Sequence, residues 1–108
     1  MTSLIQMGGE ATAVDTQNVT EAPGSFVVID VRSQGEWDSG HINGAIHIPR
    51  TQISGAIESK VPDKDASIKV YCQSGYRAGL AKKTLREMGY TNVQNLGGIT
   101  DARVKLPK

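Results

Sequence analysis

A run of apolar residues at positions 26–31 constrains the fold of this chain more than any other feature. The run reads FVVIDV and lacks the alternation of apolar and polar side chains that is typical of a strand with one face in water. Helices must cover such a strand on both faces, and this arrangement is typical of parallel sheets. The run therefore predicts a central strand of a mostly parallel sheet in an α/β domain.

A short helix is expected directly after this strand. Ser33 and Glu36 have the Ser-x-x-Glu spacing of a capping box, in which two side chains satisfy the first amide groups of a helix. Gly40 can supply the left-handed residue that commonly ends a helix. Together these residues predict a helix of about two turns around Trp37.

Two further stretches have the apolar spacing of amphipathic helices. The first ends before Pro62, and its apolar residues are Ile53, Ile57 and Val61. The second begins at Arg77 and ends at Gly89, where a left-handed cap is expected. Its stripe consists of Leu80, Ala81, Thr84, Leu85 and Met88.

Shorter apolar stretches between the helices predict the remaining strands. They lie at residues 45–48, 67–71 and 92–96, and residues 11–14 suggest a further short edge strand. Because strands and helices alternate, we expect about five mostly parallel strands with helices on both faces of the sheet. Ligands of such sheets bind beyond the carboxyl ends of the strands.

The length and charge of the chain limit its organisation and its partners. Its 108 residues suit one domain over residues 1–108, of which residues 1–25 are only weakly patterned. The 12 Lys and Arg residues nearly balance the 11 Asp and Glu residues, which argues against nucleic acid or a membrane surface as a partner. No stretch resembles a signal peptide or a membrane span, so we expect a soluble cytoplasmic protein.

Cys72 is the single cysteine of the chain. A disulfide within the chain is therefore excluded, and with only two histidines a metal site built by the protein is not expected. Cys72 directly follows the strand predicted at 67–71, at the carboxyl end where ligands bind. Covalent chemistry in this chain would depend on one thiol.

The segment after Cys72 has the features of a cradle for an anion. It consists of Gln73, Ser74, Gly75 and Tyr76 and leads to Arg77. Glycine lets the backbone curl so that amide groups converge on the sulfur, and the next helix directs its positive end to the same place. These features favour a thiolate, and Arg77 can hold that thiolate or an anionic substrate. We therefore expect Cys72 to be a nucleophile and the five residues after it to bind substrate.

Five blocks of this sequence, taken in order, resemble the single-domain members of the rhodanese family of sulfurtransferases. The resemblance covers residues 26–107 and rests on IDVR (29–32) with EW (36–37), GHINGA (40–45), VYCQSGYRA (70–78), GGI (97–99) and LP (106–107). It implies a five-stranded parallel sheet and no cofactor. It also implies that Cys72 takes the outer sulfur of a small anionic donor such as thiosulfate as a persulfide. Cyanide or another thiophilic acceptor would then receive that sulfur.

Three alternatives share this fold. A persulfide carrier that serves a protein acceptor would have the same loop. A regulatory interaction module would be expected to have lost Cys72 or Gly75, which this chain keeps. Phosphatases and arsenate reductases also use a cysteine in an amide cradle, but these phosphatases have one more residue between cysteine and arginine than the four found here. The shorter loop suits a sulfur atom better than a tetrahedral phosphoryl group.

Other residues of these blocks are expected to be structural. Asp30 and Arg32 suit a charged pair at a strand end. His41 lies between a helix end and a glycine turn, which suits a structural hydrogen bond better than a catalytic base. Trp37 is expected in the core or in the wall of a cleft.

Overall fold

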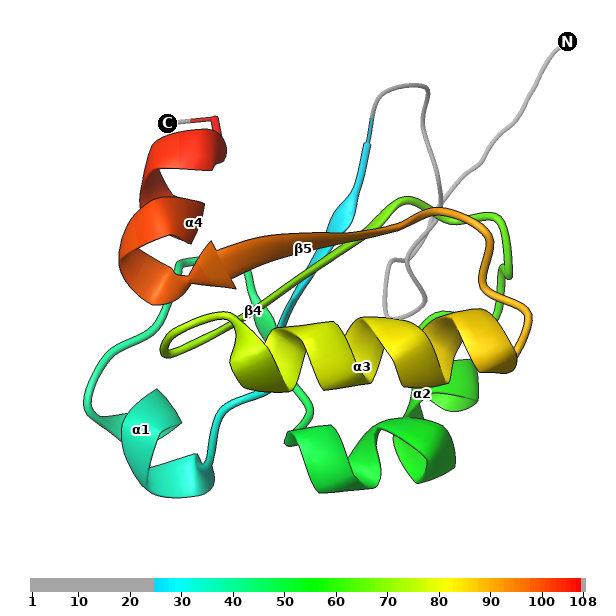
Figure 1. Cartoon of the computed structure of the whole chain (residues 1–108), viewed down its shortest axis with the longest axis horizontal. Coiled ribbons are helices and arrows are strands. Elements are labelled where there is room, and N and C mark those ends of the chain that lie inside the picture. Colours follow the sequence, from blue (N-terminus) through cyan, green and yellow to red (C-terminus); the bar gives the residue numbers. More distant parts are fainter. Residues whose placement is uncertain (1–24, 108) are drawn as a thin grey trace, which may run out of the picture.

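The computed structural model describes residues 25–107, and Figure 1 shows their path. Strands and helices alternate along the chain, as predicted. The elements are β2 (Val27–Asp30), α1 (Gln34–Asp38), β3 (Ile46–His47), the 3-10 turn η1 (Arg50–Gln52), α2 (Ile53–Lys60), β4 (Ile68–Cys72), α3 (Tyr76–Glu87), β5 (Val93–Gly98) and α4 (Ile99–Lys105). None of the helices in this part of the chain is both long and apolar enough to cross a membrane.

The strands form one parallel sheet in the order β3-β2-β4-β5. β2 is paired on both sides, and all of its residues are buried. The run at 26–31 is therefore confirmed as an interior strand. Residues 25–107 contain four strands rather than the expected five or so, and the strand suggested at residues 11–14 lies outside the described residues.

Helices cover both faces of the sheet, as expected. Figure 1 shows α2 and α3 on one side of β5 and α4 on the other. The first face buries Ile53 and Ile57 of α2 and Ala78, Ala81 and Leu85 of α3 against Val27, Ile29, Ile68 and Val70 of the strands. The second face buries Ile99 and Ala102 of α4 against Val28, Tyr71 and Leu96. Because successive strand residues point to opposite faces, both sets must be apolar, which explains the unalternating pattern of β2.

The ends of the helices follow the predicted capping residues. The Ser33 hydroxyl accepts from the Glu36 amide at 3.3 Å, and the Ser33 amide donates to the Glu36 carboxylate at 3.0 Å, which completes the capping box of α1. Gly40 follows α1 with a φ of 139°, and Gly89 follows α3 with a φ of 100°. These caps direct the chain from α1 towards β3 and from α3 towards β5.

Candidate active site

Cys72 is the last residue of β4, and its side chain has no exposed surface. It lies at the carboxyl end of a strand that is paired on both sides, by β2 and by β5. We call residues 72–77 the Cys72 loop. This loop runs from the end of β4 into the first turn of α3. The thiol therefore lies where the sequence predicted it, at the edge of the sheet where parallel α/β domains bind ligands.

Two backbone amides donate hydrogen bonds to the Cys72 sulfur. The Gly75 nitrogen lies 2.9 Å from Sγ, and the Ala78 nitrogen lies 3.4 Å from it. Gly75 has a φ of 102°, a conformation that other residues adopt at an energetic cost, and it forms the N-cap of α3. Ala78 belongs to the first turn of α3, where amide groups have no partner within the helix. The two amides and the positive end of the helix favour negative charge on the sulfur.

β5 holds the Cys72 loop in place through two glycines and an asparagine. A Cβ atom on Gly98 would lie only 2.5 Å from the carbonyl oxygen of Gln73, so only glycine lets the loop approach this closely. The side-chain amide of Asn95 donates to the Gly75 carbonyl at 3.1 Å, and its oxygen accepts from the Gly97 amide at 2.8 Å. Asn95 was not among the predicted site residues. It thus fixes the carbonyl of the residue whose amide contacts the sulfur.

A buried ion pair supports the loop from the other side. Asp30 is completely buried and Arg32 is 4% exposed, and their closest charged atoms lie 2.8 Å apart. Arg32 also donates to the Gly40 carbonyl at 2.6 Å and to the side-chain oxygen of Gln73 at 3.2 Å. The hydrogen bond with Asp30 raises the pKa of Arg32, so this guanidinium stays charged. The pair joins β2, the turn that follows α1 and the Cys72 loop, which agrees with its expected structural role.

Arg77 binds Glu36 rather than the thiol. Its two terminal nitrogens lie 2.7 Å and 2.9 Å from the two carboxylate oxygens of Glu36, in a bidentate pair. Each of these side chains is about one-third exposed, at 33% for Arg77 and 32% for Glu36. The sequence interpretation gave Glu36 only the capping of α1 and gave Arg77 to the thiolate or an anionic substrate. In the structure, an anion that reaches Arg77 shares it with Glu36 or displaces Glu36.

The Glu36–Arg77 pair makes stability depend on pH. The hydrogen bond from Arg77, helped by the Ser33 amide, lowers the pKa of Glu36 from the ordinary value of 4.5 to about 2. Between these values the unfolded chain binds more protons than the folded chain. The stabilising contribution is therefore complete above the ordinary value and is lost as the pH falls towards the folded value.

We expect Glu36→Gln to lower the free energy of unfolding near neutral pH by no more than about 1 kcal/mol, because the pair is partly exposed. The variant should also lose less stability than the wild type between about pH 6 and about pH 3. Chemical denaturation at both pH values measures this difference. If the two proteins lost equal stability on acidification, Glu36 would not be the titrating group.

The remaining residues of the Cys72 loop are open to an approaching molecule. Gln73 and Ser74 are exposed, and the Tyr76 side chain is 74% exposed. Among the described residues, the amides of Gly75 and Ala78 are the ones within hydrogen-bond reach of the sulfur. The structure thus brings the predicted Gly75 to the sulfur, adds Ala78, and leaves the side chains of Ser74 and Tyr76 exposed to solvent.

Both histidines of the chain stack on the Trp37 ring. The His41 ring stacks on Trp37 with a centroid distance of 3.4 Å, and the His47 ring stacks with a centroid distance of 4.8 Å. His41 Nδ1 lies 3.0 Å from the Trp37 carbonyl, and His47 Nε2 lies 2.8 Å from the Arg32 carbonyl. These contacts agree with a structural role for His41.

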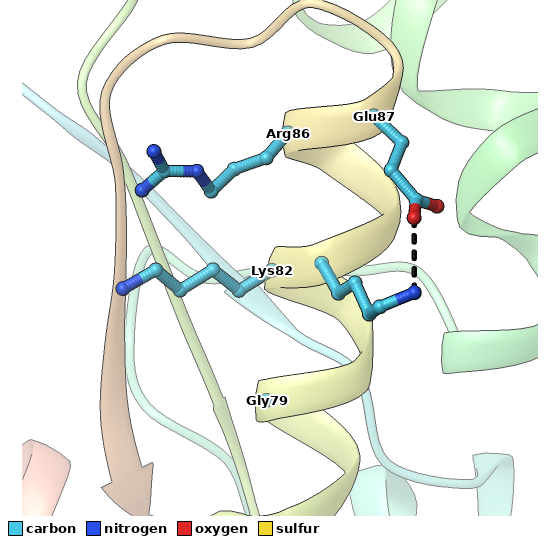
Figure 2. Close-up of a pocket in the computed structure, with 5 residues that line it drawn as sticks. Gly79, Lys82, Arg86 and Glu87 are labelled. Carbon is cyan, nitrogen blue, oxygen red and sulfur yellow. Dashed lines mark hydrogen bonds and ion pairs between the residues drawn. The ribbon is translucent and has the colours of Figure 1, made fainter.

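One hollow lies on the flank of α3, and another lies beside the start of α1, the turn η1 and the start of α3. The larger, of about 430 Å³, is lined by Gly79, Lys82, Lys83, Arg86 and Glu87. Figure 2 shows that Lys82 and Arg86 extend the same way from α3. Lys83 forms an ion pair with Glu87 at 2.9 Å. The residues that line this hollow include neither Cys72 nor any other residue of the Cys72 loop. The smaller, of about 200 Å³, is lined by Val31, Arg32, Ser33, Pro49, Arg50, Thr51 and Arg77 and therefore borders the Cys72 loop.

Proteins of known class are similar to this chain in sequence and in fold. Residues 12–103 match the rhodanese-like domain. Over 80 residues the chain is 45% identical to the thiosulfate sulfurtransferase PspE of Escherichia coli strain K12. The aligned region covers 74% of this chain and 75% of PspE. A solved rhodanese with anions from E. coli is 42% identical and superposes with a TM-score of 0.71, covering 77% of this chain and 95% of that one. The human single-domain sulfurtransferase TSTD1, at 26% identity, gives a TM-score of 0.66 and covers 79% of this chain and 87% of its own.

The fold, the buried thiol and these relatives define the class of the protein. The chain belongs to the rhodanese family. Within that family it is a sulfurtransferase, an enzyme that moves sulfur from a donor to an acceptor. The resemblance inferred from the sequence blocks is thereby confirmed.

Proposed function

We propose that the protein is a thiosulfate sulfurtransferase in which Cys72 carries the sulfur as a persulfide. The observation that carries this proposal is the pair of amide donors, from Gly75 and Ala78, that converge on a buried thiol at the carboxyl end of β4. Such a site stabilises a sulfur anion and needs no histidine base. PspE, the E. coli relative at 45% identity, is named for the same reaction, which supports the choice of thiosulfate as donor.

The proposed reaction has two displacement steps. The Cys72 thiolate attacks the outer sulfur of thiosulfate, the sulfur–sulfur bond of thiosulfate breaks, and sulfite leaves with the bonding electron pair. The outer sulfur stays on Cys72 as a persulfide. Cyanide then attacks this outer sulfur, thiocyanate leaves, and the Cys72 thiolate is restored. Because a sulfur anion is present before and after each step, the same amide donors can stabilise every stage.

In the proposed reaction, the exposed residues of the Cys72 loop bind the donor. Gln73, Ser74 and Tyr76 would contact it at the entrance, and Arg77 would attract its negative charge. Arg77 is suited to this role because one-third of its side chain is exposed although Glu36 binds it. The Glu36 carboxylate also limits the anions that can stay there, since a bound anion must compete with a fixed negative charge.

The intact mass of the protein tests the proposal. Incubation with excess thiosulfate should add one sulfur atom, about 32 Da, and peptide mapping should place it on Cys72. Later addition of cyanide should restore the original mass and release thiocyanate. Protein alkylated at Cys72 with iodoacetamide is the control and should gain no sulfur. A folded, reduced protein that gains no sulfur from thiosulfate would contradict thiosulfate as the donor.

The acceptor in this proposal is a thiophilic molecule. Cyanide, a small thiol or a protein thiol could each attack the outer sulfur of the persulfide by the same chemistry. We propose a cytoplasmic location, where reduced thiols are abundant and a lone cysteine stays reduced. Fractionation of cells that produce the protein from its own gene would test this location.

A further inference from the structure

Asn95 is a partly buried polar residue of β5 that has no role in the steps of the proposed reaction. Its side-chain oxygen accepts from the Gly97 amide of the same strand at 2.8 Å, and its side-chain nitrogen donates to the Gly75 carbonyl at 3.1 Å. One partner can only donate and the other can only accept, so the orientation of the Asn95 amide is fixed. Asn95 therefore presents a hydrogen-bond donor to the Cys72 loop in a defined direction.

The Gly75 carbonyl is held from two sides. The Gly79 amide donates to it at 3.0 Å within the first turn of α3, and Asn95 donates to it from β5. A carbonyl oxygen has two lone pairs, so these two bonds use its capacity. The backbones that Asn95 joins also lie close together, since a Cβ atom on Gly75 would be 3.3 Å from the Gly97 Cα. The direction of the Gly75 carbonyl is thus set jointly by α3 and β5.

The residue that Asn95 holds is also the one whose amide lies closest to the sulfur. The Gly75 nitrogen is 2.9 Å from Cys72 Sγ, whereas the Ala78 nitrogen is 3.4 Å from it. Glycine has a wide choice of backbone angles, and Gly75 has a φ of 102°, so its contacts must select its conformation. A bond that fixes the Gly75 carbonyl restricts rotation about this residue and thereby the direction of its amide.

We infer that Asn95 is a positioning residue for the sulfur chemistry of Cys72. It holds the Gly75 carbonyl and so keeps the shorter of the two amide bonds directed at the sulfur, where negative charge is stabilised. Asn95 acts through Gly75, because its own hydrogen bonds within residues 25–107 go to backbone groups and not to the sulfur. The inference deepens the proposed function, since it rests on Cys72 as the nucleophile.

Alkylation of Cys72 by iodoacetamide in Asn95→Ala tests the inference. Iodoacetamide is uncharged and needs no donor site, so its rate reports on the thiol itself. A weaker bond from Gly75 should lower the ionised fraction of the thiol by about tenfold, which corresponds to about 1.4 kcal/mol. A less stabilised thiolate attacks faster, which offsets part of this loss. We therefore expect the second-order rate near neutral pH to fall by about threefold.

The amide proton of Gly75 provides a second readout, which a loss of stability alone would not change. In isotope-labelled protein its NMR signal reports the hydrogen bond to the sulfur directly. We expect Asn95→Ala to move this signal upfield, because the bond becomes longer. Asn95→Asp is the second variant, in case Asn95→Ala does not fold. It keeps an oxygen for the Gly97 amide but has no donor for Gly75, so the same two changes are expected.

Two substitutions elsewhere in β5 are the matched controls. Gln94→Ala removes the same functional group from the next residue, whose exposed side chain accepts from Lys69 at 3.0 Å and has no hydrogen bond to the loop. Val93→Ala removes apolar volume from the core and so lowers stability. Under conditions in which the proteins are folded, both controls should keep the wild-type alkylation rate and the wild-type Gly75 signal.

The inference requires both changes in a folded Asn95 variant. Either an unchanged alkylation rate or an unmoved Gly75 signal would overturn it. An equal fall in the rate of Val93→Ala would also overturn it, since the effect would then come from a weakened fold. Neither measurement uses thiosulfate. If thiosulfate does not load Cys72, the proposed donor is wrong, while the role of Asn95 is still decided.

Discussion

Cys72→Ser is expected to abolish sulfur transfer, with a fall in kcat/KM of at least about a thousandfold. An alcohol at this position is not ionised near neutral pH, and its oxygen cannot form a persulfide. No other cysteine can replace it, because the chain contains one. The hydroxyl is close in size to the thiol and can accept from the same Gly75 and Ala78 amides, so the fold should be retained.

Two measurements check this result. Thiocyanate formation from thiosulfate and cyanide gives the activity, and the intact mass after thiosulfate shows whether any sulfur is held. Circular dichroism and thermal unfolding show whether the variant is folded. Transfer at a rate near that of the wild type in a folded Cys72→Ser protein would remove Cys72 from the mechanism.

Gly98→Ala is expected to give the second largest loss, although it adds one methyl group. The new Cβ would lie 2.5 Å from the Gln73 carbonyl oxygen, 3.2 Å from the Gln73 carbonyl carbon and 3.3 Å from the Ser74 Cα. These are backbone atoms, so a side-chain rotation cannot relieve the clash and the Cys72 loop must move. We expect a cost of about 1–3 kcal/mol in unfolding free energy. We also expect slow, incomplete persulfide formation, because the displaced loop carries the Gly75 amide that donates to the sulfur.

Gly55→Ala provides the matched control for this substitution. Gly55 lies within α2 and is exposed, and a Cβ atom there would meet nothing within 4 Å beyond its neighbouring residues and the backbone of its own helix. Alanine favours a helix more than glycine, so this variant should gain up to about 1 kcal/mol and keep its activity. Denaturant unfolding and the mass assay, applied to both variants, compare the two glycines. Normal persulfide formation by Gly98→Ala would show that the loop tolerates movement away from β5.

The sequence predicted most of the fold because its local signals agree with one another. The unalternating run of β2, the capping box at Ser33 and the glycine after α3 each act within a few residues, and each is found in the structure. The position of Cys72 was also predictable, since it follows from the end of one strand and the start of one helix. The number of strands was harder to predict, because short strands differ little from other extended segments in a single sequence.

Contacts between distant parts of the chain were not predictable from the same signals. Glu36 was assigned to a cap, and nothing near it in the sequence indicates that Arg77 would bind it. Asn95 lies in an ordinary strand, yet its side chain binds both the Gly75 carbonyl of the Cys72 loop and the Gly97 amide of its own strand. Two glycines in succession at 97–98 carried a signal, but its meaning required knowledge of what lies opposite them. Such residues act through tertiary neighbours, and only the three-dimensional arrangement identifies those neighbours.

The support of the Cys72 loop by β5 also bears on how the chain folds. The amides that face the sulfur come from residues near Cys72 in sequence, so they can gather as soon as α3 forms. Asn95 and Gly98 lie beyond α3, and parallel pairing of β4 with β5 closes a long loop before it gains contacts, which makes this step slow. Until β5 docks, neither Asn95 nor Gly98 fixes the path of the Cys72 loop. The final placement of the amides around the thiol is therefore tied to the completion of folding rather than to the sequence of the loop alone.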